Sequence, residues 1–152
     1  MSCPTSAFIS YGVTVTPDDL DGEFGGGEPR NALALAVGVD PADHTDHLGD
    51  NDVSDFLWLY ATAKRILRRK PFGVWTFGSY AEGGSAWVLG VRFVYVDGDG
   101  FGAAEFDPAA IARKVARLKR DRVLQAAFAR VRKALPTVDP PSVVCGVMLR
   151  GG

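Results

Sequence analysis

The side chains best suited to bind a metal ion lie in one polar segment, residues 40–55. His44 and His47 are three residues apart, and three aspartates lie around them: Asp43, Asp46 and Asp50. Imidazole nitrogens and carboxylate oxygens are common ligands of zinc and other divalent ions. The spacing within a loop fixes no coordination geometry, however, and no second cluster of His or Cys completes a ligand set. A solvated acidic loop is therefore the preferred interpretation, and we predict no metal and no cofactor.

The chain offers little material for nucleophilic catalysis. Cys145 lies within an apolar stretch that predicts a strand, where a buried and inert thiol is expected. Ser79 and Ser85 have no obvious general base, because both histidines lie in one loop. The sequence contains no phosphate-binding loop, dinucleotide fingerprint or zinc-hydrolase motif. We predict a non-enzymatic protein, with a hydrolase built on paired carboxylates as an open alternative, since the chain has 18 acidic residues.

Charge is strongly segregated along the chain, although the net charge is only −1. Residues 1–62 contain eleven acidic residues and a single basic one, Arg30, whereas residues 63–152 contain sixteen basic and seven acidic residues. Such asymmetry indicates either a charged partner or two halves of one fold that neutralise each other.

Three groups of residues are candidates for contact with a partner. Arg113, Arg117 and Arg120 belong to a basic helical segment that could contact phosphates, or that is simply a solvated helix face. The loop aspartates Asp43, Asp46 and Asp50 could form an acidic docking surface. Trp58 falls opposite the apolar stripe of a predicted helix, and exposed tryptophan is typical of interfaces.

The elements that must position these residues follow from periodicity and capping signals. Period-two alternation and runs of β-branched residues predict five strands, over Ala7–Val15, Ala32–Val39, Phe72–Tyr80, Ala86–Asp97 and Ser142–Leu149. Period-3.6 stripes predict helices over residues 52–70 and 107–135. Asp107 and Pro108 form a helix start, and the apolar stripe turns near residues 119–122, so two consecutive helices or a kink are expected there.

The order of elements, ββαββαβ, predicts a single α/β (α+β) domain over residues 1–152. Its sheet is expected to be mixed or mostly antiparallel, with about five strands and two main helices. The expected core comprises Ile9, Tyr11, Val13, Leu35, Val37, Phe56, Tyr60, Leu67, Val74, Leu89, Val91, Phe93, Ile111, Val115, Phe128, Val131 and Val147.

Composition sets the remaining limits. At 47% hydrophobic residues the chain is too apolar to be a disordered tail, and no apolar run is long enough for a membrane span. Two cysteines, Cys3 and Cys145, are too few for a disulfide scaffold. We therefore expect a cytoplasmic protein.

The final residues, Leu149-Arg150-Gly151-Gly152, resemble the end of ubiquitin. The order of elements also resembles a β-grasp fold with an extra helix. This resemblance implies a modifier whose terminal Gly151 and Gly152 are joined to lysines. A strand that frays into two glycines is the simpler interpretation.

Four short blocks resemble small accessory proteins of tailed bacteriophages. They are Ile9-Ser10-Tyr11-Gly12-Val13, Phe77-Gly78-Ser79-Tyr80, Ser85-Ala86-Trp87-Val88-Leu89-Gly90 and Glu105-Phe106-Asp107-Pro108. The resemblance implies a protein that acts in the cytoplasm of the host cell by binding a host protein, with inhibition of a host defence as one version. A ubiquitin-like modifier and a nucleic-acid-binding protein are the alternatives.

Overall fold

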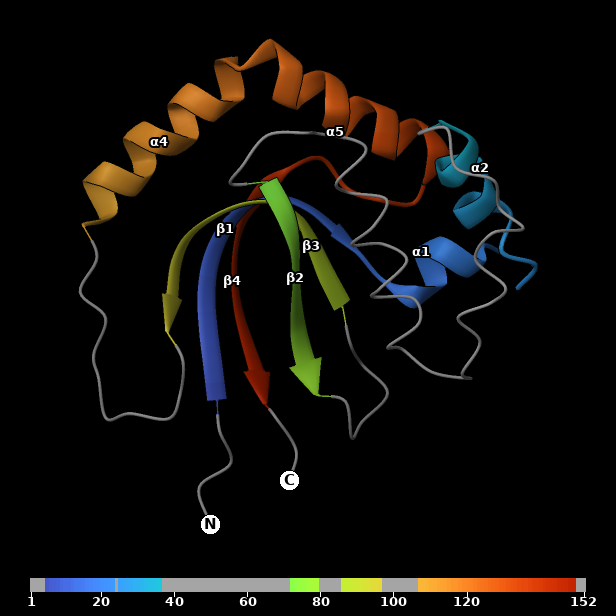
Figure 1. The fold of residues 1–152 in the computed structure, drawn as a ribbon, viewed down its shortest axis with the longest axis horizontal. Helices are drawn as coiled ribbons and strands as arrows, with labels where there is room; N and C mark the ends of the chain where they lie inside the picture. The colour runs from blue at the N-terminus through green and yellow to red at the C-terminus, as the bar shows by residue number, and fades with distance from the viewer. Residues whose placement is uncertain (1–4, 24, 37–71, 80–85, 97–106, 150–152) are drawn as a thin grey trace.

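The computed structural model describes residues 5–23, 25–36, 72–79, 86–96 and 107–149. These residues form an α+β fold in which one sheet is covered on one side by helices (Figure 1). The strands are β1 (Thr5–Val15), β2 (Phe72–Ser79), β3 (Ala86–Val96) and β4 (Ser142–Leu149). The helices of the described residues are α1 (Pro17–Asp21), α2 (Glu28–Ala36), α4 (Pro108–Arg120) and α5 (Arg122–Ala134).

The four described strands close into a barrel in the order β1-β3-β2-β4. Strand β1 pairs antiparallel with both β3 and β4, and β2 pairs antiparallel with β3. The ring is closed by a short parallel contact between β2 and β4, in which Gly78 pairs with Met148 and Ser79 with Leu149. The α+β class and the mostly antiparallel pairing agree with the prediction.

The predicted strand over Ala32–Val39 is wrong, because residues 28–36 form helix α2. Leu33 and Leu35 alternate with alanines, which gives the period of a strand, but alanine has the highest helix propensity. Glu28 and Pro29 also suit a first helical turn. In the helix Leu33 is buried while Leu35, predicted as core, is 68% exposed. Four strands of the predicted five are thus present among the described residues.

The predicted helical segment 107–135 is confirmed as two consecutive helices, each with an aspartate cap. Asp107 Oδ1 accepts a hydrogen bond from the Ala109 amide at 3.0 Å. Asp121 ends α4 and starts α5, and its Oδ1 accepts from the amides of Val123 and Leu124 at 3.1 Å each. Each cap satisfies amides that lack a partner in the first turn of a helix. The predicted helix 52–70 lies outside the described residues.

Helix α1, which follows β1, is hydrogen-bonded to the segment after α5. Thr16 and Asp19 form a capping box, in which the Thr16 amide donates to Asp19 Oδ2 at 2.8 Å. The Thr137 hydroxyl, beyond α5, donates to Asp19 Oδ1. This carboxylate therefore holds the start of α1 against the segment that leads into β4.

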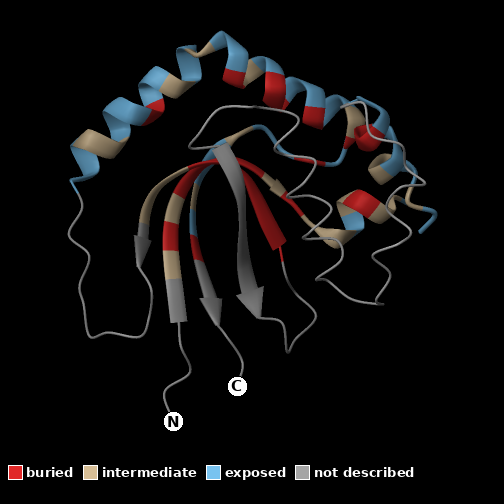
Figure 2. Ribbon diagram, in the orientation of Figure 1, coloured by how far each residue is buried: buried red, intermediate tan, exposed pale blue. Residues whose placement is uncertain are grey.

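The core lies between the sheet and the helices α1, α2 and α5 (Figure 2). Its centre is an edge-to-face contact between Tyr11 and Phe128, with ring centroids 5.8 Å apart. Seven predicted core residues are buried: Tyr11, Val13, Leu89, Val91, Val115, Phe128 and Val131. Ile9, Phe93 and Ile111 are only partly buried, and the large buried side chains of Leu20, Leu33 and Trp87 were not predicted. Val37, Phe56, Tyr60 and Leu67 lie outside the described residues. Val74 and Val147 lie in the strands β2 and β4, where only the backbone is described.

Two glycines allow β1 and β3 to pair at their closest point. Gly12 pairs with Gly90, and a Cβ on Gly12 would lie 2.0 Å from the carbonyl oxygen of Leu89. A Cβ on Gly90 would lie 2.1 Å from the carbonyl oxygen of Tyr11. Because both obstacles are backbone atoms, neither can be relieved by a side-chain rotation.

We predict that Gly90→Ala lowers the free energy of unfolding by about 3 kcal/mol or more, since the added methyl forces the two strands apart. Gly26→Ala is the matched control, because nothing lies within 4 Å of a Cβ at that position and its φ is not positive. Its effect should stay within about 0.5 kcal/mol. Urea denaturation measures both variants, and equal midpoints would contradict the close strand pairing.

Candidate functional site

The described residues include only part of the predicted partner-binding set. Arg113, Arg117 and Arg120 are exposed on α4. The other predicted residues lie outside the described residues: Asp43, Asp46, Asp50, His44, His47, Trp58, Gly151 and Gly152. Within the described residues, no group of three or more His, Cys, Asp or Glu side chains could hold a metal ion. None of the described helices is long and apolar enough to cross a membrane.

Nine basic residues of α4 and α5 are exposed, and we call them the basic surface. They are Arg113, Lys114, Arg117, Lys119, Arg120, Arg122, Arg130, Arg132 and Lys133. The only acidic residues between positions 107 and 134 are Asp107 and Asp121, and both act as helix caps. Arg113 lies 3.9 Å from Asp107, but both side chains are more than half exposed, so this ion pair contributes little.

Acidic residues cluster at the other end of the helical layer. Asp18, Glu23 and Glu28 are exposed on and around α1 and α2. Helix α2 packs against α5, so this acidic cluster continues the layer formed by the basic helices (Figure 1). The two ion pairs measured between described residues are local, since Arg30 pairs with Asp21 at 3.6 Å and Arg113 with Asp107. Across the described part of the chain, both signs of charge are therefore presented at the surface.

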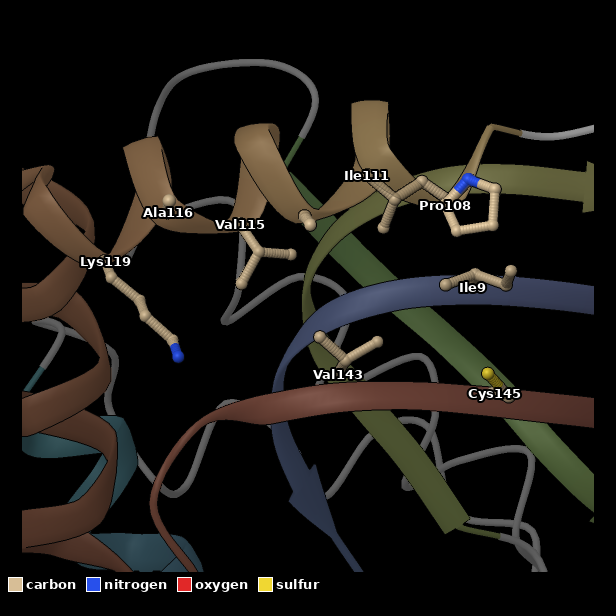
Figure 3. Close-up of a pocket in the computed structure, with 9 residues that line it drawn as sticks. Ile9, Pro108, Ile111, Val115, Ala116, Lys119, Val143 and Cys145 are labelled. Carbon is tan, nitrogen blue, oxygen red and sulfur yellow. The ribbon is translucent and has the colours of Figure 1, made fainter.

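A groove of about 500 Å³ lies between α4 and the strands β1 and β4 (Figure 3). Helix α4 contributes one stripe of side chains: Pro108, Ile111, Ala112, Val115, Ala116 and Lys119. Ile9 of β1 and Val143 and Cys145 of β4 form the floor. Among the described lining residues Lys119 is the only charged one, and Figure 3 shows its side chain extending from α4 toward the strands.

The groove exists because the two helices pack differently on the sheet. Helix α5 buries Leu124, Ala127, Phe128 and Val131, whereas α4 buries only Val115 (Figure 2). The alanines at 112 and 116 are too small to fill the space above β4. Val143 is consequently 48% exposed.

Cys145 is exposed, and the prediction of a buried thiol is wrong. The residue does lie in a strand, as expected, where it pairs with Ile9. Its side chain faces the groove, which α4 leaves uncovered (Figure 3). Strand membership was therefore predictable, but coverage by a helix was not.

The junction between α4 and α5 is held over the sheet by Gln125. Its side-chain amide donates to the carbonyl oxygen of Leu118 at 3.0 Å and to the hydroxyl of Tyr11 at 3.2 Å. The Leu118 carbonyl also accepts from the Asp121 amide at 3.1 Å, so Gln125 gives this last-turn carbonyl of α4 a second hydrogen bond. The bond to Tyr11 ties the junction to the centre of β1, and so fixes where α4 leaves the sheet.

Sequence reasoning placed the cations correctly but missed the groove. Ile9, Ile111 and Val115 were predicted as core, with no sign that the first two are only partly covered. One signal was present in the sequence: Ala112 and Ala116 lie beside Ile111 and Val115 on the same helix face, so half of that stripe is small. Comparisons of the chain with protein-family models, curated proteins and solved structures found no match.

We predict that Gln125→Met lowers the free energy of unfolding by about 1–2 kcal/mol, because it removes both hydrogen bonds at the junction. Tyr11→Phe should cost about 1 kcal/mol, since only the bond to Gln125 is lost. The two variants share that bond, so the double variant should lose less than the sum of the two. Thermal and urea unfolding measure all three. Strict additivity would show that the amide does not couple β1 to the junction.

Proposed function

We propose that the protein is non-enzymatic and binds another protein, with the basic surface of α4 and α5 as its docking face. The observation that carries this proposal is the exposure of nine cations on two consecutive helices. These helices and their caps carry only two acids, Asp107 and Asp121, against nine cations, and the ion pair of Asp107 with Arg113 is exposed to solvent. Such a surface attracts an acidic partner and accelerates association.

A protein partner fits the charges better than a nucleic acid does. The acidic cluster around α1 and α2 lies in the same helical layer as the basic surface. A protein can offer complementary patches of both signs, whereas nucleic acid presents phosphates alone and would be repelled by the acidic end. The aromatic residue of α4 and α5, Phe128, is buried and offers no base-stacking platform.

The resemblance to phage accessory proteins makes a host protein the proposed partner, and inhibition of a host defence the proposed consequence. In this proposal Trp58 and the loop aspartates Asp43, Asp46 and Asp50 extend the interface beyond the described residues. Nucleic-acid binding is the second candidate, and the same nine cations favour it.

The deciding experiment is a pull-down of the tagged protein from host lysate, with and without nuclease. A discrete band of fixed stoichiometry that survives nuclease supports the protein partner. Loss of all partners after nuclease would overturn the first proposal in favour of nucleic acid. A ladder of adducts that resist denaturant would instead indicate conjugation through Gly151 and Gly152.

For the captured partner, we predict that the triple variant Arg113→Gln, Arg117→Gln, Arg120→Gln slows association by about tenfold at low salt, and that its rate depends less on ionic strength. The matched control replaces the same three residues with lysine, which keeps the charge. Its association rate should stay within about twofold of the native rate, as an electrostatic effect requires. Stopped-flow or surface-based kinetics measures both, and an unchanged rate in the glutamine variant would remove α4 from the interface.

A further inference from the structure

We propose that the groove beneath α4 binds a free single-chain amphiphile with an anionic headgroup, of the fatty-acid type. The acyl chain would lie along the apolar stripe of α4, and Lys119 would pair with the carboxylate. The groove shares Lys119 with the basic surface proposed above as the docking face, but its apolar lining is separate from that face. The inference is tested with the purified chain alone, so it holds or fails without a partner protein.

The size and lining of the groove suit such a ligand. Its volume of about 500 Å³ lies within the range of small-molecule sites, about 300–1,000 Å³. The lining extends along α4 from Pro108 to Lys119, eleven helical steps of 1.5 Å, or about 16 Å. Ligand sites are typically apolar with a few placed polar groups, and here the polar groups are one ammonium and one thiol.

The position of Lys119 gives the site a direction. The residue is the last of the stripe, at the α5 end of α4, and the lining residues toward Pro108 are uncharged. An acyl chain with an anionic headgroup at one end fits this arrangement. Its tail would cover Ile111 and Val143, and its headgroup would pair with the ammonium group of Lys119. A dianionic or doubly polar ligand would leave its second polar end against Ile9 and Pro108 without a partner.

An extended peptide fits the groove less well. Each of its residues brings an amide and a carbonyl that need hydrogen-bond partners. Strand β1 is paired on both sides, with β3 and with β4, so it offers no free edge to an added strand. Strand β4 is paired with β1 along Ser142–Leu149 and with β2 at Met148 and Leu149. A peptide in the groove would lie over the faces of these two strands, where it meets side chains and not backbone partners. The backbone of α4 is satisfied within the helix. An acyl chain has no such requirement.

The test is titration of the purified full chain with decanoate below its micelle concentration, followed by calorimetry and by amide chemical shifts. Decanoate should bind and shift resonances of the groove residues, and octanoate should bind more weakly, by about fourfold for each methylene removed. Decyltrimethylammonium has the same tail and the opposite charge, and should bind at least about tenfold more weakly because Lys119 repels it. Equal affinity for the two headgroups would overturn the proposal.

Two pairs of variants locate the site. Lys119→Met should abolish the preference for the anionic headgroup, whereas Lys114→Met, which removes an exposed cation of α4 outside the groove, should keep it. Ala116→Phe should fill the groove and abolish binding, whereas Ala129→Phe on the exposed face of α5 should not. Unchanged decanoate binding in both Lys119→Met and Ala116→Phe would place the ligand elsewhere and overturn the proposal. Binding only to anionic vesicles, with none to decanoate, would also overturn it.

Discussion

The close pairing of Gly12 with Gly90 is the contact on which the arrangement of the sheet depends. Backbone atoms of β1 and β3 occupy the space where two side chains would otherwise lie. The pairing continues into β2, where Gly73 is opposite Gly90, so a row of glycines crosses three strands. Without Cβ atoms along this row, neighbouring strands can approach and bend, as a ring of only four described strands requires. The side chains on either side of the row, Tyr11, Val13, Leu89 and Val91, are then held against the helical layer.

The two long helices pack differently on this sheet: α5 packs tightly, and α4 packs loosely. Tyr11 contacts Phe128 through its ring and Gln125 through its hydroxyl, so the centre of β1 fixes both the first turns of α5 and the junction with α4. Beyond that point, α5 fills the space above the sheet with Leu124, Phe128 and Val131. Helix α4 continues away from the junction with one buried side chain, and the space beneath it becomes the groove.

Local signals in the sequence predicted the local structure well. The start of α4 was predictable, because Asp107 bonds an amide only two residues away and is followed by Pro108. The break near residues 119–122 was also predicted, but the capping role of Asp121 there was not. The strand predicted at 32–39 failed because alternating leucine and alanine satisfies both a strand and a helix, and packing of Leu33 against the core decided between them. The exposed cations were predictable from residue type, since arginine and lysine seldom lose their hydration. The groove was not predictable from the sequence. It is a gap between α4, β1 and β4, and the distance between these three elements depends on tertiary packing and not on the residues of any one segment.

The exposed charge and the groove have a common origin in the way α4 is held. A helix of α4's composition, with five basic residues in thirteen, gains little from burial, and its stability must come from its ends. Asp107 caps the first turn, and Leu118 O at the last turn accepts from Gln125. Held at both ends, α4 fully buries only Val115, while Ile111 and Leu118 are partly buried against the core. Its apolar stripe is therefore left partly uncovered at the groove, and its five cations, with Lys119 at the groove, are exposed. The tight packing of α5 on the sheet contributes the stability that the loosely packed α4 does not. Because α4 buries so little, both the basic surface and the groove beneath the helix are left accessible.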